Sequence, residues 1–151
     1  MPSADQIEMQ GGPDAFADGV EENVLPLSEP PRSRRLSRGI VSLAFIAAGV
    51  NHFVNPKWYE RMVPPPLQDQ AGPVVAISGV AEIAGGLGVL LPWTRRLSGL
   101  SLVALLVAVF PANVYMAVEP ERFKKIPHWA LFARLPLQPL MMLWVLRATR
   151  R

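Results

Sequence analysis

Four apolar segments, each close to twenty residues long, constrain this chain more than any other feature. They run over about residues 36–54, 72–91, 97–118 and 128–146. A helix needs about 20 apolar residues to cross about 30 Å of hydrocarbon. Four such segments in succession leave almost no polar face for a water-soluble bundle. The sequence therefore predicts an all-α fold, an integral membrane antiparallel four-helix bundle over residues 32–151.

Lys and Arg residues beside these segments predict the orientation, because cytoplasmic flanks carry the excess of positive charge. Nine lie on one side: Arg32, Arg34, Arg35, Arg38, Arg95, Arg96, Arg147, Arg150 and Arg151. Five lie on the other: Lys57, Arg61, Arg122, Lys124 and Lys125. We expect both termini in the cytoplasm of a multi-pass protein of the cell membrane. Arg38 falls inside the first segment and is expected to snorkel to the headgroups.

Residues 1–31 have the opposite charge, with seven Asp and Glu and no Lys or Arg. They are rich in Gly, Pro and Ser and poor in aromatic residues, so they cannot bury enough apolar surface to offset the entropy of ordering. We predict a disordered acidic cytoplasmic tail. Such a tail is usually only solvated, and docking of a partner is the alternative.

The connections between the segments differ in length. Residues 92–96 suffice only for a tight turn, so the second and third helices are predicted to be antiparallel neighbours. Residues 55–71 form a longer outer loop with prolines at 64, 65 and 66. Proline fixes φ and lacks an N–H, so we expect an extended polyproline stretch that lies across the bundle mouth.

Polar residues inside the apolar segments are the candidate site. At 1.5 Å per residue, Glu82 lies roughly 15 Å and Arg134 roughly 9 Å from the outer ends of their helices. An ionisable group at the bilayer centre costs at least about 2.5 kcal/mol, so both should face the bundle interior and find partners. Gln138, Asn113 and His52 fall in the same outer half. A Glu82–Arg134 pair that only clamps the helices is an equally weighted reading.

Small residues follow one face of the second segment. Ser78, Gly79, Gly85 and Gly86 fall within one arc at helical spacing. Glycine allows close approach of a neighbouring helix, the usual packing device in lipid. This face is predicted to be a helix-packing surface.

Several classes of function are disfavoured. The chain has no cysteine, which excludes disulfides, thiolate nucleophiles and Cys-ligated metal centres formed by its own residues. His52 and His128 are the two histidines and have no ligand spacing, so no metal site is expected. The arginines flank apolar segments and are not interleaved with aromatic residues, so nucleic acid is not an expected partner.

Read together, these positions resemble the DoxX family of small four-helix membrane proteins, in particular its DoxX-like branch. The similarity covers roughly residues 36–147. It is carried by Gly49, His52, Phe53, Pro56, Tyr59, Pro64, Pro65, Ser78, Gly79, Glu82, Gly85, Gly86, Leu90, Pro92, Thr94, Arg95, Phe110, Pro111, Ala112, Asn113, Met116, Arg134, Leu135, Pro136, Leu137 and Gln138.

The resemblance implies a membrane subunit with a quinone or redox association, and it implies no particular reaction. On this reading His52 and Glu82 accept or pass protons, while Asn113, Arg134 and Gln138 hold a carbonyl oxygen of a quinone. The implied partners are lipid, a membrane or redox protein, or further copies of the chain. We expect no enzyme activity from the chain alone. The alternatives are a non-enzymatic assembly or scaffold factor and, with less support, a small transporter.

Overall fold

Residues 32–150 are described by the computed structural model, so the tail predicted over residues 1–31 lies outside the described residues. The described part is helical and contains no β-strand. Four of its helices are long and apolar enough to cross a membrane: α1 (Arg32–Val54), α3 (Ala71–Leu90), α4 (Arg95–Val118) and α5 (His128–Thr149). The prediction of an all-helical fold with four long apolar helices is confirmed.

The helix bounds differ from the predicted ones by at most four residues. The largest difference is at α1, which begins at Arg32 and not near residue 36. Arginine is a good helix former, so the helix continues beyond the apolar residues that reveal it in the sequence. With 23 residues, α1 is about 34 Å long at 1.5 Å per residue.

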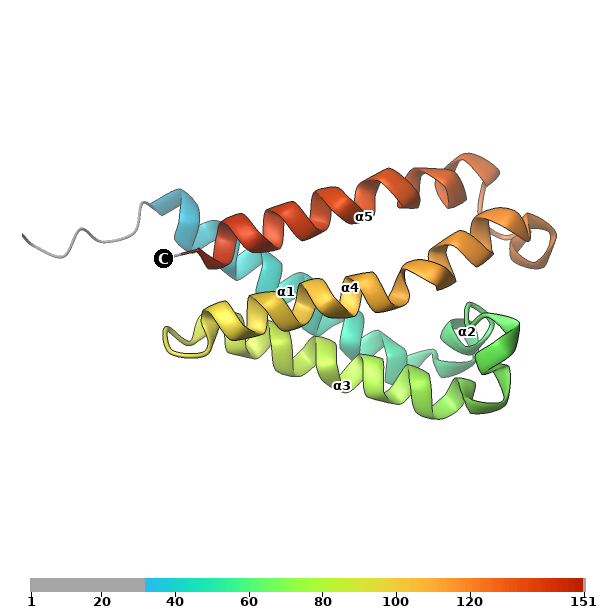
Figure 1. Cartoon of the computed structure of the whole chain (residues 1–151), viewed down its shortest axis with the longest axis horizontal. Coiled ribbons are helices and arrows are strands. Elements are labelled where there is room, and N and C mark those ends of the chain that lie inside the picture. The colour runs from blue at the N-terminus through green and yellow to red at the C-terminus, as the bar shows by residue number, and fades with distance from the viewer. Residues whose placement is uncertain (1–31, 151) are drawn as a thin grey trace, which may run out of the picture. The chain divides into compact units, whose positions relative to one another are not determined.

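Consecutive long helices run in opposite directions (Figure 1). The largest contact joins α1 and α3. Smaller contacts join α3 to α4 and α4 to α5, and a still smaller contact between α1 and α5 closes the bundle. The start of α1, the α3–α4 turn and the end of α5 meet at one end, which we call the arginine-rich end. The opposite, loop-rich end carries α2 (Pro56–Glu60), η3 (Pro65–Gln70) and η4 (Pro120–Phe123).

The proline-rich loop differs from the expected extended stretch. Pro64 alone is extended, at φ −62° and ψ 153°, whereas Pro65 and Pro66 open the 3-10 helix η3. The fixed φ of proline also suits the first positions of a helix, where no N–H is needed. Both α2 and η3 pack against α3.

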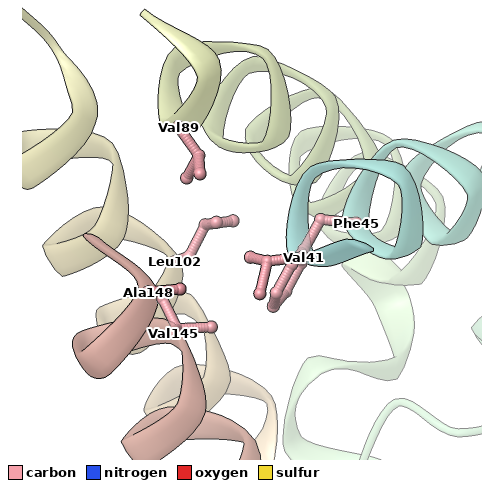
Figure 2. Close-up of a cluster of buried hydrophobic side chains, with 6 residues drawn as sticks. All are labelled: Val41, Phe45, Val89, Leu102, Val145 and Ala148. Atoms are coloured by element: carbon pink, nitrogen blue, oxygen red, sulfur yellow. The ribbon is translucent and has the colours of Figure 1, made fainter. Parts of the chain in front are cut away.

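The core is continuous at the arginine-rich end. Six buried apolar side chains from all four long helices point toward one another there (Figure 2): Val41, Phe45, Val89, Leu102, Val145 and Ala148. At the loop-rich end the core divides into two clusters. One contains Val63, Ala71 and Val75, and the other contains Met116, Phe123 and Leu131.

Arg38 extends its side chain toward the arginine-rich end of the bundle. Its side chain is buried at the arginine-rich end, where Nε donates to Ala148 O at 2.8 Å and Nη2 donates to Arg150 O at 3.3 Å. The last carbonyls of a helix have no partner within the helix and carry its negative dipole end. Arg38 therefore caps α5 and ties it to α1.

Candidate functional site

A cavity of about 450 Å³ lies where the core divides. Val63 and Val75, from one of the two clusters, are among its lining residues. Most of the lining is apolar, and the polar lining residues are Asn51, His52, Tyr59, Ser78, Glu82, Asn113 and Arg134. Ligand pockets have this character, with volumes of about 300–1,000 Å³ and a few polar groups in an apolar wall.

The segment between α1 and α3 contributes one wall of the cavity. Trp58, Tyr59 and Met62 line it from α2 and the following turn. Trp58 also packs edge to face on Phe123 of η4, with ring centroids 6.4 Å apart. The segment therefore connects the α1–α3 side of the bundle with the α4–α5 side.

His52 and Glu82 face each other across the α1–α3 contact. His52 Nδ1 lies 3.3 Å from Glu82 Oε2 and 2.9 Å from Ala48 O. Because a carbonyl oxygen only accepts, Nδ1 carries the proton and donates it to Ala48 O. The contact with Glu82 is therefore electrostatic, without a hydrogen bond. The imidazole also stacks on the Tyr59 ring, with centroids 3.8 Å apart.

Close approach of α1 and α3 positions this pair. A Cβ added to Gly49 would lie 2.6 Å from Gly79 O, and a Cβ on Gly79 would lie 2.9 Å from His52 Cβ. His52 and Glu82 each follow one of these glycines by three residues along its own helix. Because Gly49 and Gly79 have no side chains, the two helices lie close enough for the imidazole and the carboxyl group to contact each other.

Two buried polar atoms in the cavity wall have no hydrogen-bond partner among the described residues: Ser78 Oγ and Glu82 Oε2. An unsatisfied buried polar group costs about 1–3 kcal/mol. Native structures seldom retain such groups unless water, an ion or a ligand reaches them. Both atoms belong to α3 and both residues line the same cavity.

Gln138 is not among the residues that line the cavity, contrary to the sequence-based expectation that it holds a ligand. Its amide nitrogen donates to Leu106 O, and its amide oxygen accepts from Asn113 Nδ2 at 2.9 Å. Pro111, five residues after Leu106, lacks the N–H that would bond the carbonyl of residue 107 and so interrupts the hydrogen-bonding pattern of α4. Gln138 therefore joins α5 to α4 and orients Asn113 toward the cavity.

Arg134 lines the cavity but forms no ion pair with Glu82 in the part of the chain that the structure describes. Its Nη1 instead donates to Met116 Sδ at 3.6 Å, and sulfur is a weak acceptor. The Glu82–Arg134 clamp considered from the sequence is therefore not formed. Glu82 contacts His52 at the α1–α3 side of the cavity, and the Arg134 guanidinium lies at the α5 side. The Glu82 carboxyl group and the Arg134 guanidinium both border the cavity.

The predicted packing face of α3 lies in helix contacts. Ser78, Gly79, Gly85 and Gly86 are buried. An added Cβ would meet Leu102 of α4 at Gly85, and Ile46 and Ser42 of α1 at Gly86. The small residues therefore allow α3 to pack closely against α1 on one side and against α4 on the other.

The sequence-based analysis did not identify Asn51, Trp58, Tyr59 or Met62 as site residues. Asn51 Nδ2 donates to the Tyr59 hydroxyl at 2.9 Å, which holds the phenol beside His52. The available signal was the Trp-Tyr pair two residues after Pro56, which is also typical of a membrane interface.

Comparison of the sequence with known protein families assigns the chain to one of them. A model described as a domain of unknown function, DUF8561, matches residues 41–149. The chain belongs to this family. The DUF8561 match contains every residue that lines the cavity. No curated protein and no solved structure matches the chain.

Proposed function

We propose that this DUF8561 protein is a multi-pass protein of the cell membrane. The support is the apolar exterior of its four long helices. In α4 and in α5, only 17% of an apolar stretch of 18 residues is buried within the bundle. Leu43, Ile77 and Leu140 are among the large apolar side chains that face outward, each at least 60% exposed. In water this surface would cause association, whereas in lipid it is the solvent-compatible face.

The arginine-rich end faces the cytoplasm in this proposal, together with both termini. Of the charged residues described there, all are arginines, whereas the loop-rich end mixes Lys and Arg with Glu and Asp. The positive-inside bias favours this orientation.

Cysteine labelling tests both insertion and orientation, because the natural chain has no cysteine. Trp93→Cys lies in the α3–α4 turn and Gln70→Cys at the end of η3, and both positions are exposed. We expect a membrane-impermeant maleimide to label Gln70→Cys in intact cells and Trp93→Cys only after lysis. The reverse pattern would refute the orientation, and labelling of both in intact cells would refute insertion.

We further propose that the 450 Å³ cavity binds a small amphipathic ring molecule of the quinone class. Ser78 Oγ and Glu82 Oε2, the buried atoms that lack a hydrogen-bond partner within residues 32–150, carry this proposal. Both residues line the cavity from α3, and most of the lining residues are apolar. The complementary ligand therefore has an apolar ring with an oxygen substituent at the α3 wall. A hydroxyl can donate to Glu82 Oε2, and a carbonyl oxygen can accept from the Ser78 hydroxyl.

The residues on the α4–α5 side suit the second oxygen of such a ring. Arg134 carries five N–H donors, and the Asn113 amide retains a second N–H beside the one given to Gln138. His52 exposes its imidazole to the cavity next to Glu82, so the pair can hold or pass a proton at the bound oxygen. The resemblance to DoxX-like proteins supports a quinone and a redox protein partner.

Glu82→Leu is expected to weaken binding of a decyl-tailed ubiquinol analogue, whose hydroxyl can donate to Glu82, by the purified chain about tenfold. Loss of one hydrogen bond to a carboxyl group accounts for about 1.4 kcal/mol, within the range for such bonds. Binding is measured by quenching of tryptophan fluorescence, since Trp58 lines the cavity. Ser78→Ala is expected to have a smaller effect in the same direction.

Glu121→Leu is the matched control, because Glu121 is an exposed acid in η4 and does not line the cavity. Its affinity should equal that of the natural chain. Absence of saturable binding in the natural chain, or equal affinity of the Glu82 and Glu121 variants, would refute the quinone proposal and favour a structural role for the polar cluster.

A further inference from the structure

A second cavity, of about 330 Å³, lies at the arginine-rich end between the start of α1 and the end of α5. Its lining residues are Ser33, Arg34, Ser37, Arg147, Ala148 and Arg150. The guanidinium-bearing residues among them are exposed, and they come from helices more than one hundred residues apart in the sequence. We call this the basic cavity.

No carboxylate lies beside the basic cavity among the described residues. Glu60, Asp69, Glu119 and Glu121 belong to the loop-rich end, and Glu82 lies in the middle of α3. The first turn of α1 contains no acid, and its positive dipole end carries several arginines. Like charges at the N-terminus of a helix are unfavourable, so a bound anion would relieve this arrangement.

The walls of the basic cavity are fixed by buried contacts. Arg38 donates to Ala148 O and Arg150 O, and Trp144 Nε1 donates to Ser37 Oγ at 3.0 Å. These bonds hold the two helices together on the membrane side of the cavity. The guanidinium groups of Arg34 and Arg147 are therefore presented from opposing walls on a rigid base.

Apolar side chains continue from the basic cavity along both helices. On α5, Leu143 and Leu140 precede Arg147 by four and seven residues, so they share its face, and both are exposed. On α1, the exposed Ile40 follows Ser37 and Ser33 by three and seven residues on one face. The basic cavity thus continues into an exposed apolar surface. A ligand with a charged head and apolar chains fits this combination better than a free anion does.

We propose that the basic cavity binds the phosphate of an anionic glycerophospholipid from the cytoplasmic leaflet. The guanidinium groups of Arg34 and Arg147 contact the phosphate oxygens, the hydroxyl of Ser33 donates to them, and the acyl chains follow Leu143 and Ile40. Basic pockets between membrane helices on the cytoplasmic side bind such headgroups. The proposal rests on the membrane insertion and orientation proposed above.

The test is native mass spectrometry of the purified full chain, titrated in nonionic detergent with phosphatidylglycerol or phosphatidylcholine. We expect half-saturation with phosphatidylglycerol at a concentration at least tenfold lower. The double variant Arg34→Gln with Arg147→Gln should weaken phosphatidylglycerol binding about thirtyfold, because each arginine near the surface contributes about 1 kcal/mol.

The control is Arg32→Gln with Arg96→Gln, which removes the same charge at the same end from two exposed residues that do not line the basic cavity. It should change the affinity less than twofold. An equal loss in both double variants would overturn the proposal in favour of diffuse attraction.

Two other occupants would also overturn the proposal. Displacement of the lipid by millimolar inorganic phosphate would identify a site for free phosphate. A tenfold gain in lipid affinity from Glu21→Gln with Glu22→Gln in the full chain would identify the acidic segment as the occupant. If the maleimide labelling supports insertion while lipid selectivity is absent, the basic cavity proposal alone fails.

Discussion

Gly49→Ala should abolish accumulation of folded protein. The added Cβ would lie 2.6 Å from Gly79 O and 3.0 Å from Ile83 N, which are backbone atoms of α3. No side-chain rotation relieves these contacts, so α1 and α3 must separate along their main contact. Overpacking costs about 1–3 kcal/mol, and a clash with backbone atoms belongs at the upper end of this range, above the gain of about 1 kcal/mol that alanine brings to a helix. The readout is the fraction of monodisperse protein in fluorescence-detected size-exclusion chromatography.

Gly39→Ala is the matched control, because it makes the same substitution in the same helix and its added Cβ meets no atom within 4 Å. We expect natural or slightly higher yield and melting temperature. A Gly49→Ala variant that melts within about 2 °C of the natural protein would show that the α1–α3 contact is wider than described here. Gly85→Ala should be intermediate, since the obstructing atoms belong to the Leu102 side chain, which can shift.

Hydropathy sufficed to predict the four long helices, because length and apolarity are properties of each segment alone. The short helices α2, η3 and η4 were not predicted. Their sequences contain prolines and charges that also suit extended loops, and their conformation depends on contacts such as Trp58 with Phe123. The buried contacts of Arg38 were not predicted for a related reason. Its partners are carbonyl groups at residues 148 and 150, which no local pattern reveals.

The candidate site was only partly predictable. Counting residues along a helix gives the depth of a side chain, and it indicated that His52, Glu82, Asn113 and Arg134 share the outer half. Depth does not determine the direction in which a side chain points around the bundle. That direction decides that Glu82 meets His52 and not Arg134, and that Gln138 turns toward α4 instead of the cavity.

The two ends of the bundle have different packing, and the difference explains the location of both cavities. At the arginine-rich end, one cluster joins all four long helices and leaves space only at the surface, where α1 and α5 begin and end. At the loop-rich end, the core divides and α2 connects the two sides, so the larger cavity lies within the bundle.

Arg38→Met should lower the melting temperature of the detergent-purified protein by roughly 5–10 °C, equivalent to about 2–3 kcal/mol for a chain of this size. Methionine has a similar length and suits a buried position, but it cannot donate to Ala148 O or Arg150 O. Hydrogen bonds from a charged donor contribute about 1.5–3 kcal/mol each. Part of this loss is offset, because Arg34 lies one turn away and repels the buried charge.

Arg32→Met separates this capping role from general effects of charge, since Arg32 is exposed in the first turn of the same helix. It removes the same charge from the arginine-rich end and should leave the melting temperature unchanged within about 2 °C. Arg38→Lys keeps the charge but has a single donor group, so it should fall between Arg38→Met and the natural chain. If Arg38→Met and Arg32→Met have the same melting temperature, the contacts of Arg38 with the end of α5 do not stabilise the bundle. The orientation of the protein would then be the main role of this arginine.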